Sequence, residues 1–138
     1  MGSIVGVARG LCVLAMCLVL AACGSDDPDV PSLPEAPAPT GATKFWPRAD
    51  IVDPRPLPVT SWSRLSDDRI AVHFETGTPE CFGVDATVTE TEDAVTVTLL
   101  GGTLPEMQDR MCVMIAVAGT LEVPLPSPLG ERAVIVGA

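Results

Sequence analysis

The sequence predicts an all-β fold, a small antiparallel sandwich or twisted sheet of five to six strands. Three segments rich in valine and threonine alternate apolar with polar residues: 69–75, 84–89 and 95–99. Alternation with a period of two is typical of strands that bury one face. Three further apolar segments complete the expected set: 111–118, 121–123 and 133–136.

The connections between these segments carry turn residues. Thr91-Glu92-Asp93 suits a hairpin, and Gly101-Gly102 is expected to end the third strand. Thr103-Leu104-Pro105-Glu106 resembles a capping box and predicts one helical turn. Asp67-Asp68 reads as a turn that enters a strand. Met111–Ala118 is apolar in both phases, which favours a central strand covered on two faces; a short buried helix fits the same composition.

Proline dominates the stretch that precedes the predicted strands. Each proline removes a backbone donor and fixes φ, so we expect an extended, disordered, proline-rich tether without regular structure. Phe45-Trp46 is expected to dock on the domain, because two aromatic side chains are seldom left in water. The chain is thus expected to have three parts: a leader, 1–22; the tether, 23–58; and the small β domain, 59–138.

The charge of the chain limits its partners. The 138 residues carry a formal net charge of −10, which becomes −11 once Arg9 is removed with the leader. The lysine and arginine residues are scattered singly and form no basic stripe. Phosphate backbones and anionic headgroups repel such a chain, so we expect no nucleic-acid partner. The acidity favours a soluble surface over a specific cation site.

Residues 1–22 have the features of an export leader. One positive charge, Arg9, precedes an uncharged apolar run, Leu11–Ala22. As a helix this run would span about 18 Å, less than the roughly 30 Å of a bilayer core. The run therefore suits a secretory signal better than a membrane span.

Leu20-Ala21-Ala22-Cys23 resembles the lipobox of bacterial lipoproteins. The resemblance implies that a diacylglyceryl group is attached to the Cys23 sulfur and that a signal peptidase cuts between Ala22 and Cys23. Acyl chains such as palmitate would then hold the protein on the extracytoplasmic face of the cell membrane. A plain secreted protein with an accidental cysteine is the alternative. The polar residues after Cys23 form no basic stop-transfer cluster, which favours the lipoprotein.

The part beyond the anchor resembles small uncharacterised bacterial lipoproteins with a two-cysteine domain, a resemblance that implies no activity. Cys12 and Cys17 would leave with the leader. Cys81 and Cys112 then remain in an oxidising compartment, which favours one structural disulfide. The alternative, a redox-active pair, usually has Cys-x-x-Cys spacing, which these residues lack.

His73 is the single histidine, and alternation places it opposite Ile70, Val72 and Phe74, on the surface. It cannot complete a zinc site without further ligands. As a base for a serine it would need a positioned acid, and no serine has a Gly-x-Ser-x-Gly context. We therefore expect no catalytic residue, metal or cofactor.

Methionines and tryptophans leave two further interpretations open. Met107, Met111 and Met114 would form a stripe on a helix, and thioethers suit copper(I), although methionine is also ordinary core filler. Trp46 and Trp62 are candidate anchors for a partner, and core packing is favoured for Trp62. Glu90, Glu92 and Asp93 are expected to form a solvated hairpin tip.

Together these features predict a lipid-anchored, extracytoplasmic, non-catalytic module that binds an envelope protein or a wall component. The alternative is a small-ligand or copper carrier. The expected membrane partner is lipid, held through the acyl chains on Cys23.

Overall fold

The computed structural model describes residues 31–138, so the leader, the lipobox and Cys23 lie outside the described residues. In this range the chain forms strands and one short 3₁₀ turn. These are β1 (Thr43–Phe45), β2 (Val52–Pro56), β3 (Val59–Ser66), β4 (Arg69–Thr76), β5 (Phe82–Glu90), β6 (Ala94–Thr103), η1 (Pro105–Met107), β7 (Val117–Pro124) and β8 (Ala133–Val136). No helix among residues 31–138 is long and apolar enough to cross a membrane.

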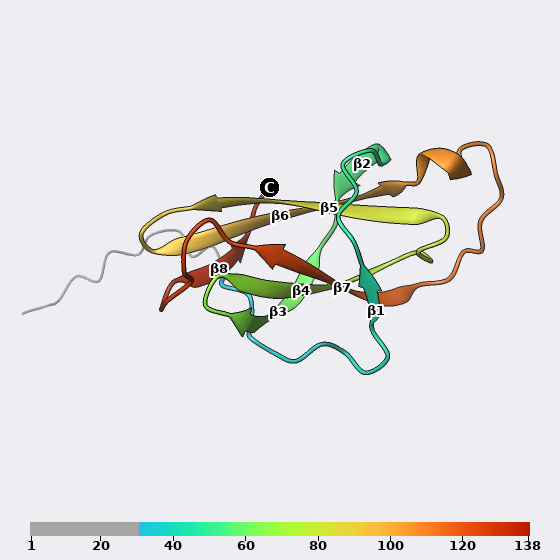
Figure 1. Ribbon diagram of the computed structural model, residues 1–138. Coiled ribbons are helices and arrows are strands. Elements are labelled where there is room, and N and C mark those ends of the chain that lie inside the picture. The colour runs from blue at the N-terminus through green and yellow to red at the C-terminus, as the bar shows by residue number, and fades with distance from the viewer. Residues whose placement is uncertain (1–30) are drawn as a thin grey trace, which may run out of the picture.

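The strands form two four-stranded sheets that pack as a sandwich (Figure 1). One sheet has the order β1-β7-β4-β3. In the other, β6 is central: β5 pairs along one side, while β2 and β8 pair with opposite ends of its other side. Neighbours are antiparallel except for β1 with β7 and β6 with β8. The predicted all-β fold is confirmed.

The alternating segments build the core as predicted. Ile70, Val72 and Phe74 of β4 are buried in the same cluster as the valines of β6. Trp62 also belongs to this cluster, and its Nε1–H donates to the Leu33 carbonyl at 3.0 Å. Core packing of Trp62 is therefore confirmed, and its polar atom is satisfied inside the protein.

The prediction of a disordered tether is wrong for residues 31–58, which belong to the sandwich. Leu33 N–H donates to β8, Ala36 N–H to β3 and Arg48 N–H to β5, each at 2.8 Å. β1 adds to β7, and β2 adds to β6. This segment, 31–56, which we call the edge segment, pairs with five strands in turn. The expected domain boundary at Val59 thus falls inside the folded unit.

Proline explains why the edge segment resembles a disordered tether in sequence and why it pairs only at sheet edges. A proline cannot donate to a ladder, so it is excluded from central strands but tolerated on a sheet edge. The edge segment pairs only at edges, through short strands and isolated bridges at Ser32, Glu35 and Pro47. Together with β3, which alternation did not reveal, it raises the number of strands from the expected five or six to eight.

The expected strand or buried helix at 111–118 is also wrong. Residues 111–116 form neither; β7 begins at Val117. Met111 is 100% exposed and Met114 is 87% exposed, so their apolar character does not reflect burial. We call Met111–Ala116 the apolar arm.

The predictions for turns and strand ends are confirmed in part. The hairpin at Thr91-Glu92-Asp93 and the turn at Asp67-Asp68 are confirmed. A helical turn forms at η1, but its N-cap, Leu104, makes no side-chain capping hydrogen bond. Gly101-Gly102 does not end β6, which continues to Thr103. A Cβ on Gly102 would lie 2.6 Å from the Val52 carbonyl oxygen, so this glycine lets β2 approach.

Candidate binding surface

The apolar arm lies at the end of the sandwich opposite the start of the described chain. Ser32 bridges to β8, which pairs with the first residues of β6, while the arm follows the last ones. The ten residues of β6 separate the two ends by roughly 30 Å. Figure 1 shows the arm as a long unpaired connection between η1 and β7.

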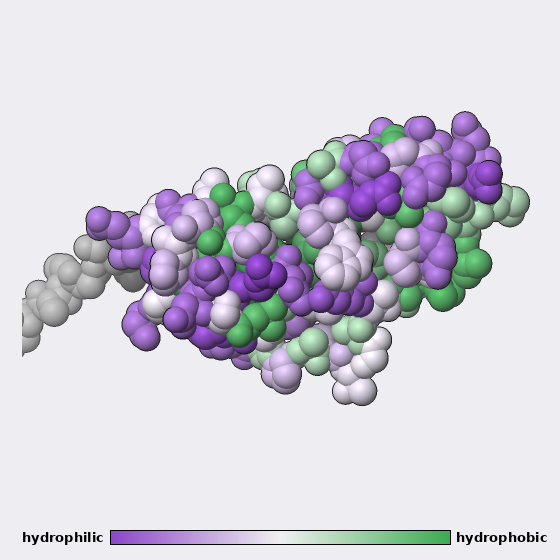
Figure 2. All heavy atoms as spheres, in the orientation of Figure 1, coloured by the Kyte–Doolittle hydropathy of each residue, from purple (hydrophilic) through white to green (hydrophobic). Residues whose placement is uncertain are grey.

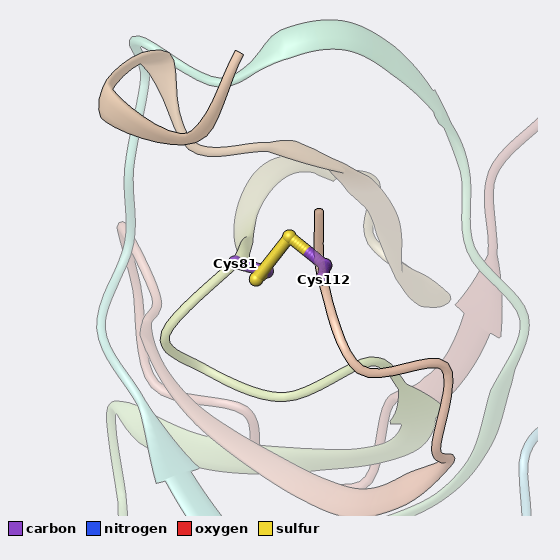
Figure 3. Close-up of a disulfide and its surroundings, with 2 residues drawn as sticks. All are labelled: Cys81 and Cys112. Atoms are coloured by element: carbon purple, nitrogen blue, oxygen red, sulfur yellow. A yellow bond between two sulfur atoms is a disulfide. The ribbon is translucent and has the colours of Figure 1, made fainter. Parts of the chain in front are cut away.

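A disulfide fixes the arm to the sandwich. Cys112 in the arm is bonded to Cys81, directly before β5, with Cα atoms 6.1 Å apart (Figure 3). Cys81 is buried, whereas Cys112 is partly exposed. The predicted disulfide is confirmed, although Cys112 lies in an irregular segment and not in a strand. It tethers the arm at its second residue, and the arm has no strand pairing to hold it.

A depression of about 370 Å³ separates the arm from the end of β4. Met114, Ile115 and Ala116 form one wall, Glu75–Gly77 the other, and Phe82 lies between them. A Cβ on Gly77 would overlap the Phe82 ring, so only glycine lets that ring pack here. The lining is mostly apolar, and Figure 2 shows apolar atoms gathered at this end of the molecule.

His73 lies on the outer face of its sheet, as alternation predicted, but the prediction that it is exposed is wrong. Its side chain is 0% exposed. The edge segment passes from β3 to β1 and contributes Ala38 to a cavity of about 200 Å³ that His73 also lines. Nε2 lies 3.1 Å from Ser63 Oγ, and Nδ1 lies 3.1 Å from Thr120 Oγ1. Both ring nitrogens therefore have hydroxyl partners.

The structure thus brings together Ser63 and His73, a pairing that sequence reasoning did not single out. The second ring nitrogen faces a threonine hydroxyl and not a carboxylate. Glu122 lines the same cavity, but its carboxylate accepts from Lys44 Nζ at 2.7 Å and from Arg69 at 3.4 Å. The hydrogen bond from Lys44 is the main reason that the pKa of Glu122 lies below its ordinary value. A hydroxyl supplies no charge to stabilise an imidazolium, as the acid of a triad does.

The other singled-out residues are dispersed. Phe45 packs in the core against Phe74 at 5.5 Å between ring centroids, whereas its neighbour Trp46 is 67% exposed. Docking of this aromatic pair is thus confirmed for Phe45 and wrong for Trp46. Lys44 Nζ lies 4.5 Å from the centroid of the Trp46 ring, beside a depression of about 130 Å³.

The hairpin tip is not purely solvated. Glu90 accepts from Ser127 Oγ at 2.7 Å and pairs with Arg132 at 3.3 Å, and both side chains of the ion pair are largely buried. These contacts, led by Ser127, lower the pKa of Glu90. They tie the chain before β8 to the β5–β6 hairpin, whereas Glu92 and Asp93 at the tip are exposed, as predicted.

Metal-binding groups do not gather in the described range. Among residues 31–138 no three His, Cys, Asp or Glu side chains converge as a metal site would require. Met111 and Met114 are both exposed on the apolar arm, and Met107 lies in η1. No helical stripe forms, because the arm is not helical, and the favoured interpretation as core filler is wrong for Met111 and Met114.

Fold and surface define a small disulfide-bonded β-sandwich that presents an exposed apolar arm at one end. In comparisons with known proteins, the chain matches no protein family, no curated protein and no solved structure.

Replacing Cys81 and Cys112 together with alanine is expected to lower the free energy of unfolding by about 3–4 kcal/mol, because the unfolded chain regains the entropy of a long loop. The two cysteines are 31 residues apart. Urea unfolding followed by circular dichroism measures the change. Wild-type protein held in reductant is the matched control and should show the same loss. An unchanged midpoint in the double variant would contradict the assigned role.

Acidification is expected to destabilise the protein through His73. Burial lowers the pKa of His73 from its ordinary value of 6.5, an effect partly offset by the Ala36 backbone. Below pH 6.5 the unfolded chain therefore binds a proton before the folded protein does. The free energy of unfolding should fall with pH from about 6.5 downward, by at most about 1.4 kcal/mol per pH unit, until the folded-state pKa is reached.

The His73→Gln variant serves as control for this pH dependence. Its free energy of unfolding should be flat between pH 7 and pH 5, since the chain has one histidine and the shifted carboxylates titrate at lower pH. A wild-type protein whose unfolding free energy does not change across that window would refute the buried, neutral state of His73.

Proposed function

We propose that this protein is a lipid-anchored, extracytoplasmic binding module without catalytic activity, which holds an envelope partner at its apolar arm. The single observation that carries the proposal is the exposure of Met111, Val113, Met114 and Ile115 on one segment. Contiguous apolar side chains left in water are typical of interaction sites on soluble domains. The disulfide supports this role, because a fixed arm loses less entropy on binding than a free loop.

The anchor would orient this surface. If Cys23 is the lipidated amino terminus, only residues 23–30 separate it from the sandwich. Eight residues reach at most about 28 Å. Because the chain joins the sandwich at the end beside β8, the arm would lie on the side remote from the attachment point. A partner located away from the anchoring lipid would meet the arm first.

The polar clusters favour binding over catalysis. The hydroxyl–imidazole pair of Ser63 and His73 lies under the edge segment, in a cavity of about 200 Å³. That volume is small for a substrate, and drug-sized ligands usually occupy about 300 Å³ or more. The carboxylate that lines the same cavity, on Glu122, is held by Lys44 and Arg69.

A second candidate function, a copper(I) carrier, is favoured by the exposure of two thioethers, Met111 and Met114, on the same arm. A carrier of this kind needs no macromolecular partner at the arm. Crosslinking at Met114 therefore separates the two functions.

The anchor is tested with Cys23→Ala. This variant is expected to keep residues 1–22 and to carry no acyl chains, because cleavage requires that the Cys23 sulfur is lipidated first. Intact mass and membrane partition are the measurements, and the Cys81→Ala, Cys112→Ala double variant, which retains Cys23, is the control. Normal maturation of Cys23→Ala with unchanged membrane partition would contradict the lipoprotein assignment.

The binding role is tested in intact cells with a photo-crosslinking amino acid at Met114. The expected result is a discrete crosslinked product that disappears when Cys23 is replaced. A crosslinker at Leu65, which is 48% exposed on β3, is the matched control and should give no such product. If no position on the surface yields a product, the binding function fails.

A further inference from the structure

The backbone of the apolar arm has no partner. Met111–Ala116 contains neither proline nor glycine and continues directly into β7. Among residues 31–138 it joins no ladder and makes no turn hydrogen bond between backbone groups. Free N–H and C=O groups that lead into a strand can pair with the backbone of another strand. The exposed backbone of the arm can therefore accept a partner chain.

The depression beside the arm can take the side chains of such a partner. In strand addition, backbone hydrogen bonds provide affinity and pockets for alternate side chains provide specificity. Here the apolar surface of Phe82, Met114 and Ile115 would receive apolar residues spaced two apart. Gly77, directly after β4, lets the Phe82 ring pack against its backbone at the floor of this surface.

The charges around the depression select a basic partner. Glu75 lines it, Glu80 precedes the bridged Cys81, and Asp109 precedes the arm. Within the described chain none of these three carboxylates forms an ion pair with a basic side chain. Arg110 precedes the arm, and Arg55 lies with Asp53 in an adjoining depression that shares Thr76 and Phe82, so acidic groups outnumber basic ones here. The chain as a whole carries a formal net charge of −10, so its electrostatic field adds to that of these three carboxylates.

The same charges disfavour the other occupants. A second copy would bring two strongly acidic chains together, and an anionic bilayer would repel the rim of the depression. The residues between Cys23 and Pro31 start from the opposite end, roughly 30 Å away along β6, and reach at most about 28 Å. A basic segment of another polypeptide has neither disadvantage.

We propose that the apolar arm binds an extended segment of another polypeptide, apolar at alternate positions and basic between them, by adding it as a strand along Met111–Ala116. This inference rests on the proposed binding function and goes beyond it, because it specifies the mode of binding and the chemistry of the partner.

The test uses the lipidated protein in detergent and a fluorescent probe peptide, acetyl-Lys-Val-Thr-Val-Lys-Val-Lys-amide. Fluorescence anisotropy should show saturable binding that weakens as salt rises. The same peptide with glutamate in place of lysine should bind at least about tenfold more weakly. Detergent micelles alone should not bind the basic peptide. Equal binding of the acidic peptide, or no binding of the basic one, would overturn the proposal.

Two further peptides test strand addition directly, because successive N–H groups of a strand point to opposite sides. One carries N-methyl groups at odd positions and the other at even positions. One of the two should lose binding about tenfold or more, and the other should bind like the parent. Equal affinities for both would overturn strand addition.

Variants locate the site. Met114→Asn should weaken binding of the basic peptide about tenfold or more, since it removes apolar surface without adding charge. Leu65→Asn, at an exposed apolar residue on β3, should bind like wild type, and circular dichroism checks that both variants are folded. Binding unaffected by Met114→Asn would overturn the site. Self-association that Met114→Asn abolishes would also overturn it, in favour of a second copy.

These results are distinguishable from failure of the binding function. A crosslinked partner in cells together with failure of the peptide tests would leave the function intact and refute strand addition. Absence of any crosslinked product would refute the function itself.

Discussion

Backbone pairing by the edge segment is the constraint on which the rest of this structure depends. A sandwich of two small sheets has open edges on every side, and each open edge is a template for unwanted pairing. Residues 31–56 contact β8, β3, β7, β5 and β6 in turn, so one continuous segment borders both sheets. Its prolines limit each contact to a few hydrogen bonds and keep the segment at the edges.

Two features follow from this border. The passage of the edge segment from β3 to β1 buries an outer face that would otherwise be in water, and His73, Ser63 and Thr120 satisfy one another there. Because the border occupies several edges, the apolar arm stands out as a segment of the described chain without backbone partners. A disulfide holds it in place of a ladder. The part of the molecule that is least paired is thus also among the most apolar on its surface.

Sequence patterns predicted the strands whose side chains alternate, and failed where burial depends on distant segments. β4, β5, β6 and β8 lie where valine-rich alternation or short apolar segments placed them, and the end of β7 does too. β1 and β2 are not evident from the sequence, because its prolines argue against regular pairing, whereas proline is excluded only from central strands. The direction of His73 was predicted from alternation, but its burial depends on a segment about 35 residues earlier in the chain.

The binding surface shows the same limit. The fate of each cysteine predicts the pairing of Cys81 with Cys112, but the apolar composition of 111–118 predicts burial, and residues 111 and 113–116 are exposed. Apolar residues are only a one-way guide to the core, since much of any protein surface is apolar. The exposed arm is evident only from the pairing of β7 with β4. All eight residues of β4 pair with Val117–Pro124, so none remains to pair with Met111–Ala116.

The structure combines a sandwich bordered by the edge segment with an arm that has no backbone partner, and amide hydrogen exchange measures this contrast most directly. The amides of Leu33, Ala36 and Arg48, which donate to the sheet edges, should be protected, while those of Met111–Ala116 should exchange at rates close to those of a free peptide. Protection of the arm equal to that of β7, or free exchange across 31–48, would contradict it.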